Sequence, residues 1–127
     1  MIGYITLGTN DLARAGDFYD ILLAEIGAKR TMTDERMLGW GTATSQTMFS
    51  VIEPFDKSEA SIGNGVMIAL DVKNAEAVNK VYEKALTLGA TDEGNPHDRG
   101  STMGFYGGYF RDLDGNKIVA YCLGWKA

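Results

Sequence analysis

The side chains best suited by type to acid–base or nucleophilic chemistry are Glu53, His97 and Cys122. Glu53 directly follows the apolar run Ser50–Ile52, and an inward-facing carboxylate there would have a raised pKa and serve as a general base or a ligand. The alternative is an exposed strand end beside Pro54. His97 is the single histidine and lies in a polar stretch, where an imidazole is usually solvated. Cys122, the single cysteine, ends an apolar run and is expected to be a small buried hydrophobic residue.

Two further motifs have the composition of an ion-binding or nucleotide-binding loop but the wrong spacing. Asp112–Asn116 alternates acidic side chains as a calcium loop does. Such a loop needs glycine at its sixth position and glutamate at its twelfth, where this sequence has Lys117 and Leu123. The segment instead predicts a hairpin turn. Gly63–Gly65 lacks the third glycine of a dinucleotide fingerprint and precedes a strand, so no nucleotide site is predicted.

Composition excludes several classes of partner. The chain has 127 residues and a formal net charge of −5, with no cluster of Lys and Arg, which argues against nucleic acid and anionic membrane surfaces. No apolar run is long enough to span a membrane. A single cysteine cannot form an internal disulfide, and the first residues lack a signal-peptide pattern, so we expect a cytoplasmic protein.

The elements that must position these side chains occur twice along the chain. Each copy has a strand, an amphipathic helix and a glycine that ends the helix: Gly3–Leu7, Asn10–Ile26 and Gly27, then Val66–Leu70, Asn74–Leu88 and Gly89. Thr9 or Asn10 is the expected cap of the first helix. Two similar modules that each bury one apolar face are expected to pack together, and the space between them is the expected ligand site.

Short strands follow each helix. The expected strands are Met37–Gly41, Thr47–Ile52, Phe105–Phe110 and Lys117–Tyr121. Residues 56–64 are the expected connection between modules, and residues 91–101 are expected to form a polar loop. Local helices combined with mostly antiparallel strands predict the α+β class and not a parallel nucleotide-binding sheet.

Two segments carry a family resemblance that covers nearly the whole chain. Tyr4–Gly8, followed by Asp11-Leu12 and Phe18-Tyr19, and the C-terminal segment Tyr109–Ile118 resemble the glyoxalase, bleomycin-resistance and extradiol-dioxygenase superfamily, the vicinal oxygen chelate fold. The resemblance implies one domain over residues 1–127. It would contain two paired βαβββ modules, about 1–60 and 64–127, forming a cupped, mostly antiparallel sheet.

Metal-dependent members of that family hold a divalent ion with two histidines and two glutamates. By resemblance, those positions correspond here to Tyr4, Glu53, Met67 and Val119. Only Glu53 keeps the family's residue, and a thioether and a valine offer a hard divalent ion no useful ligand. We therefore expect no metal and no other cofactor.

Loss of the charged ligands predicts an apolar cavity that binds a small organic molecule, within a homodimer implied by the family. The residues expected to line it are Trp40, Phe49, Met67, Tyr109, Val119 and Tyr121, with Tyr4 and Glu53 as its polar groups. The alternative is a lactoylglutathione lyase-like or isomerase-type enzyme, in which Glu53 is the general base and Tyr4 polarises the substrate oxygen. A metal enzyme rebuilt around His97 is a third, less favoured interpretation.

Overall fold

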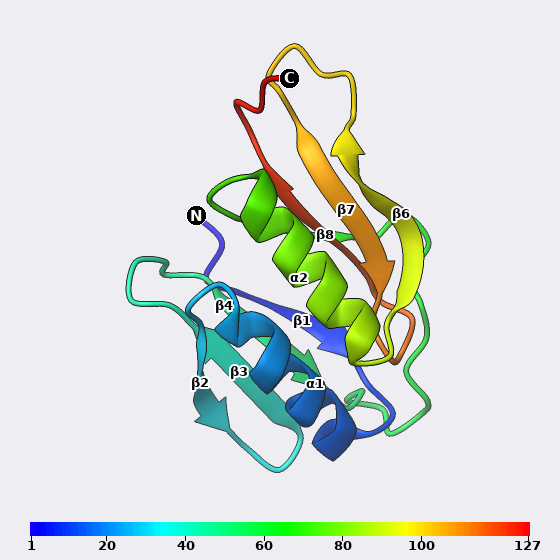
Figure 1. Cartoon of the computed structure of the whole chain (residues 1–127). Helices are drawn as coiled ribbons and strands as arrows, with labels where there is room; N and C mark the ends of the chain where they lie inside the picture. Colours follow the sequence, from blue (N-terminus) through cyan, green and yellow to red (C-terminus); the bar gives the residue numbers. More distant parts are fainter. The chain divides into compact units, whose positions relative to one another are not determined.

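The computed structural model describes residues 1–127. The chain forms two compact units, Met1–Ile62 and Gly63–Ala127. The first unit contains β1 (Tyr4–Gly8), α1 (Leu12–Ala24), β2 (Lys29–Thr33), β3 (Met37–Gly41) and β4 (Met48–Ile52). The second contains β5 (Ile68–Asp71), α2 (Ala75–Thr87), β6 (Thr91–Asp98), β7 (Tyr106–Arg111) and β8 (Lys117–Cys122). Both units thus have the order strand, helix, three strands (Figure 1).

Each unit forms one four-stranded sheet with the same topology. The strand order is β1-β4-β3-β2 in the first unit and β5-β8-β7-β6 in the second. The first and last strands of each unit pair in parallel, and the other pairs are antiparallel. Neither sheet closes on itself as a barrel. The predicted α+β class with mostly antiparallel sheets is therefore confirmed.

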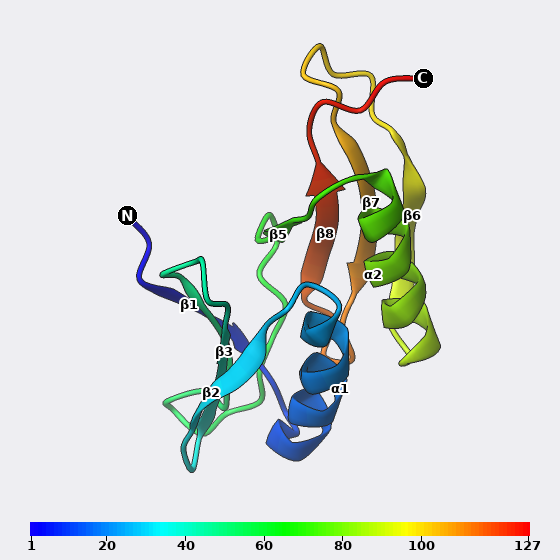
Figure 2. The ribbon, with the colours of Figure 1, turned by 60° about the vertical axis from the view of Figure 1, so that its left-hand side comes forward.

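The helix of each unit packs on one face of its own sheet (Figures 1 and 2). Helix α1 buries one apolar face made by Ala15, Phe18, Tyr19, Leu22 and Leu23. It begins two residues later than predicted, because Asp11 rather than Thr9 or Asn10 is its cap and accepts a hydrogen bond from the Arg14 N–H (3.0 Å). After the helix, Gly27 has the left-handed φ of 77° that its sequence position predicts.

Helix α2 follows its prediction closely. Asn74 caps it by accepting a hydrogen bond from the Ala77 N–H (2.9 Å), and Gly89 follows its end with φ of 103°. Its buried stripe consists of Val78, Val81, Tyr82 and Ala85. No helix of the protein has the length and apolar character needed to cross a membrane.

Strand β6 corrects the prediction of a polar loop over residues 91–101. It is an edge strand that pairs with β7 alone, so its outer side can remain polar, and Pro96 is tolerated there. The register shifts on both sides of Gly94, whose φ is 145°. The strand was not predicted because its composition is polar and its pairing is irregular.

A hydrogen bond joins β6 to α2. The Tyr82 hydroxyl donates to Asp92 Oδ1 at 2.7 Å. Burial, together with this bond to a carboxylate, raises the pKa of Tyr82 to about 12. The same bond, with a second from the Gly94 N–H, lowers the pKa of Asp92.

Candidate functional site

The second sheet has one face turned away from α2, and the glycines of β7 show which residues lie on it. A methyl group added to Gly108 would come within 3.1 Å of the Tyr82 ring of α2, so Gly108 faces the helix. Side chains alternate along a strand, so Gly107 and Tyr109 face the other way. Tyr109 pairs with Val119 of β8 and Gly107 pairs with Tyr121, which places all four residues on this opposite face.

We define the aromatic face as Phe105, Tyr109, Val119 and Tyr121. The rings of Phe105 and Tyr121 stack with centroids 5.0 Å apart and planes 5° from parallel. Val119 is fully buried (0% exposed), whereas the three rings are each half-buried. Gly107 leaves room for the stack, since a methyl group there would lie 2.8 Å from the Phe105 ring and 3.3 Å from Val119. The structure therefore brings together three of the predicted ligand contacts, Tyr109, Val119 and Tyr121.

Two cations flank Tyr109 on this face. The Arg99 guanidinium carbon lies 4.8 Å from the centre of the ring and Lys117 Nζ lies 5.5 Å from it, within the range of cation–π attraction. Arg99 is fixed by hydrogen bonds to the carbonyl oxygens of Gly94 and Gly107 (3.1 and 3.0 Å). Neither cation forms an ion pair with a carboxylate. Neither side chain was predicted as a site residue, since Arg99 lies in a segment expected to be a loop and the importance of Lys117 depends on its contact with the Tyr109 ring.

His97 contributes to holding Arg99. It lies on β6, exposed, with Nδ1 2.9 Å from the Asn95 carbonyl oxygen and Nε2 2.9 Å from Arg99 Nη1. This arrangement fits the neutral tautomer in which Nδ1–H donates and Nε2 accepts. No group of three or more His, Cys, Asp or Glu side chains is arranged to hold a metal ion, so no cluster of ligands surrounds His97.

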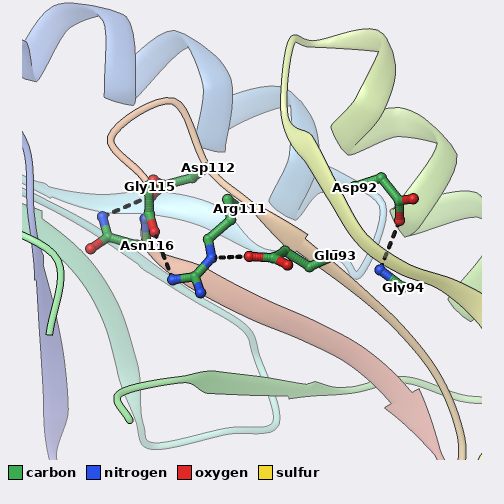
Figure 3. A network of polar contacts seen from close by, with 7 residues as sticks. All are labelled: Asp92, Glu93, Gly94, Arg111, Asp112, Gly115 and Asn116. Carbon is green, nitrogen blue, oxygen red and sulfur yellow. Dashed lines mark hydrogen bonds and ion pairs between the residues drawn. The ribbon is translucent and has the colours of Figure 1, made fainter. Parts of the chain in front are cut away.

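A polar network orders the end of β7 beside the aromatic face (Figure 3). Arg111 pairs with Glu93 of β6 and donates to the Gly115 carbonyl oxygen (3.1 Å). Asp112 is buried and accepts hydrogen bonds from the backbone N–H groups of Asp114 and Asn116, both at 2.9 Å. The carboxylate of Asp112 is thus occupied by its own turn, as the hairpin interpretation of this segment predicts. Two backbone donors on one carboxylate oxygen stabilise the β7–β8 connection.

Trp40 and Phe49 lie in the core of the first unit, beneath α1. Trp40 is 1% exposed, its centroid is 5.7 Å from that of Tyr19, and its indole N–H donates to Asp20 Oδ1 at 2.8 Å. Phe49 contacts the same tyrosine at 4.8 Å. These side chains pack against the helix. Their predicted role as ligand contacts stays a prediction, and neither presents a free surface.

The predicted polar pair, Tyr4 and Glu53, is not brought together. Tyr4 pairs with Met48 at the start of β4, whereas Glu53 follows Ile52 at its end. Their backbones are therefore separated by five residues of strand, roughly 16 Å at the usual rise per residue. Both side chains are exposed, Tyr4 by 60%. The hypothesis of an inward-facing Glu53 is corrected, because the residue lies in the solvent-exposed position beside Pro54 that was its alternative.

The residues that the family resemblance assigns to metal-binding positions do not fit a divalent ion. Tyr4 and Glu53 are too far apart along the strands to share one, Met67 is 40% exposed before β5, and Val119 has no donor atom. Cys122 supplies no thiolate either, because burial, with a smaller contribution from Asp71, raises the pKa of its thiol.

Comparison with known proteins identifies the family of the chain. The sequence model of the Glyoxalase/Bleomycin resistance protein/Dioxygenase superfamily matches residues 1–120, and the chain belongs to this superfamily. No curated protein matches the sequence significantly.

Solved structures show the same fold. A glyoxalase/bleomycin resistance protein from Albidiferax ferrireducens T118 is 27% identical with a TM-score of 0.87, covering 96% of this chain and 98% of that one. A lactoylglutathione lyase from Agrobacterium tumefaciens is 18% identical with a TM-score of 0.69, covering 96% and 92% respectively. A family enzyme from Burkholderia phytofirmans PsJN is 17% identical with a TM-score of 0.75, covering 96% and 98%. At such low identities the last two likenesses concern the fold alone.

Proposed function

We propose that this protein binds a small, planar, negatively charged organic molecule on the aromatic face, without a divalent metal. The observation that carries the proposal is the grouping of Phe105, Tyr109 and Tyr121 around buried Val119, with Arg99 and Lys117 beside the Tyr109 ring. Half-buried rings offer flat apolar surface to a planar ligand at little cost in conformational entropy.

Local charge supports an anion even though the whole chain is acidic. Arg99, Lys117 and Arg111 border the aromatic face; Glu93 pairs with Arg111, and the Asp92 carboxylate attracts Arg99 without forming an ion pair with it. Lys117 Nζ has no hydrogen-bond or ion-pair partner in the protein, so a carboxylate can reach it without displacing one. The hydrogen bonds of Arg99 to carbonyl oxygens fix its position but leave its positive charge in place.

The enzymatic alternative receives less support from the geometry. It needs Glu53 as a base and Tyr4 as an electrophile around one substrate, and the β1–β4 register separates them within the first unit. A proton-transfer group must lie within hydrogen-bond reach of the atom it serves. Binding of a ligand therefore accounts for more of the structure than turnover does.

Calorimetric titration with naphthoate tests the proposal, with naphthylmethanol and naphthylmethylammonium as neutral and cationic probes of the same shape. We expect naphthoate to bind most tightly and to bind less tightly as salt is added. Lys117→Gln should weaken naphthoate about tenfold, near 1.4 kcal/mol, while leaving naphthylmethanol unchanged. Lys73→Gln, an exposed charge before α2, is the matched control. Equal affinity for the three probes would contradict an anion site.

The homodimer implied by the family is a separate part of the proposal. Its support is the superfamily membership shown by the match over residues 1–120. Light scattering should give a mass twice that of the 13.8 kDa chain. A mass equal to one chain at all concentrations would exclude the dimer without affecting the aromatic face.

A further inference from the structure

A concave site lies entirely within the first unit, at the carboxyl ends of β1 and β4. These strands run parallel, so the residues that follow them, Thr9 and Glu53, emerge at the same edge of the sheet. A hollow of about 480 Å³ opens there, within the size range of ligand pockets. The residues of its lining that matter here are Thr9, Arg36, Glu53, Lys57, Ser58 and Glu59.

The hollow contains two charges of each sign that do not neutralise one another. Arg36 and Lys57 are basic and Glu53 and Glu59 are acidic, yet no ion pair forms among the four. Arg36 is restrained by its Nε–H, which donates to the Glu53 carbonyl oxygen (2.9 Å), and by the Phe55 ring 5.4 Å away. Its two terminal nitrogens have no acceptor in the protein. They remain available to a bidentate acceptor such as a carboxylate.

The loop that carries the other charges is held in a defined conformation. Lys57 has φ of 64°, the only positive value at a residue other than glycine, and its N–H donates to the Pro54 carbonyl oxygen (3.0 Å). A lysine in this conformation is strained, and such strain is often found at binding sites. At the other end of the loop, the Ala60 N–H donates a hydrogen bond to Asn10 Oδ1 (2.6 Å). The charged side chains thus project from an ordered backbone.

We propose that this hollow binds a small zwitterion, a molecule that carries both an ammonium group and a carboxylate. Arg36 and Lys57 receive the carboxylate, and Glu53 and Glu59 receive the ammonium group. Such a ligand satisfies both sets of charges at once, whereas a molecule with one charge satisfies one set and leaves the other unpaired. The site is open and its charges are largely exposed, so the affinity is modest, in the millimolar range. This inference does not depend on the aromatic face, which lies in the other unit.

Amide-resolved NMR titration with ω-amino acids tests this inference. Glycine, γ-aminobutyrate and ε-aminocaproate place the two charges at increasing separations, and butyrate and butylammonium each carry one charge. We expect one member of the amino-acid series to shift the amide signals of Glu53 and residues 55–60 at concentrations where butyrate and butylammonium do not. If no member shifts these signals, or if butyrate or butylammonium does so equally, the proposal is overturned.

Two variants assign the charges. Lys57→Gly removes the ammonium group and suits the positive φ, so the turn is kept; Glu59→Gln removes one carboxylate. Each substitution should reduce the affinity for the bound amino acid about tenfold. Lys29→Gln and Glu35→Gln change equivalent exposed charges of the same unit outside the hollow and should have no effect. Equal effects in the control variants would show a general response to net charge and overturn the assignment.

Discussion

Tyr4 and Glu53 occupy opposite ends of the parallel β1–β4 pair, with Tyr4 beside Met48 and Glu53 one residue beyond the Gly8–Ile52 pair. The family resemblance assigns both residues to metal-binding positions, yet the strand register separates their backbones by five residues of strand. The register also assigns them to different surroundings, since Glu53 lines the polar hollow and Tyr4 does not. This separation prevents the two side chains from binding one metal ion or acting on one reacting group.

Metal removal should leave ligand binding unchanged. Since Met67 and Val119 offer no ligand to a hard divalent ion, protein incubated with nickel, zinc, cobalt or manganese and then desalted should retain far less than one ion per chain. Elemental analysis measures this, and naphthoate titration before and after chelator treatment measures the consequence. Stoichiometric metal that survives desalting would overturn the argument from the donor set.

Gly107→Ala should disturb the aromatic face. The added methyl group would lie 2.8 Å from Phe105 and 3.3 Å from Val119, so the Phe105–Tyr121 stack must shift. We expect a loss of about 1–3 kcal/mol in the free energy of unfolding and weaker naphthoate binding. Gly3→Ala is the control, because nothing lies within 4 Å of a methyl group there. Unchanged stability and affinity in Gly107→Ala would show that this contact has no role.

Trp40→Phe should reduce stability without reducing affinity. The indole is buried against Tyr19 and donates to Asp20, so the smaller ring leaves a cavity and loses a hydrogen bond, at a cost of about 2–4 kcal/mol. Chemical denaturation measures the loss, and titration of the folded variant measures affinity. Trp125→Phe, a half-buried residue near the C-terminus, provides the comparison. Weaker naphthoate binding by the folded Trp40→Phe protein would show that Trp40 contributes to ligand binding.

Alkaline pH should destabilise the second unit through Tyr82. The pKa of this phenol is raised from 10.0 to about 12 in the folded protein, so the unfolded chain loses the proton first. The stabilisation is complete below pH 10 and is lost as the pH rises from about 10 to about 12. Unfolding free energies measured across this window should fall more steeply for the native sequence than for Tyr82→Phe. If the unfolding free energies of the two proteins fell equally with pH, Tyr82 would not be the cause of the pH dependence.

The repeated pattern allowed most of the fold to be predicted, because its signals are local. Helix caps, left-handed glycines after each helix and alternating apolar strands are all properties of neighbouring residues. Strand β6 was missed because an edge strand with Pro96 and a register shift at Gly94 has the composition of a loop. Its existence depends on pairing with β7, which local sequence does not specify.

The candidate site was only partly predictable. Which face of a sheet is covered by its helix depends on tertiary packing, and local sequence does not specify it. Trp40 and Phe49 were placed with Tyr109 and Tyr121 by residue type, yet they pack against α1, whereas the latter face away from α2. Local sequence does not distinguish the two faces, since large apolar side chains also occur on the face away from the helix, with Met48 against Gly39 in the first unit and Tyr109 in the second. Arg99 and Lys117 acquire their importance only from their shared contact with the Tyr109 ring, which is a tertiary feature.

An amide-resolved NMR titration of the full chain with naphthoate tests the anion-binding aromatic face. We predict saturable shifts concentrated at residues 105–109 and 117–121, much smaller shifts with naphthylmethylammonium, and loss of the naphthoate shifts in the Tyr109→Leu variant. Shifts confined to residues 1–62, or equal responses to the anionic and cationic probes, would contradict an anion-binding aromatic face.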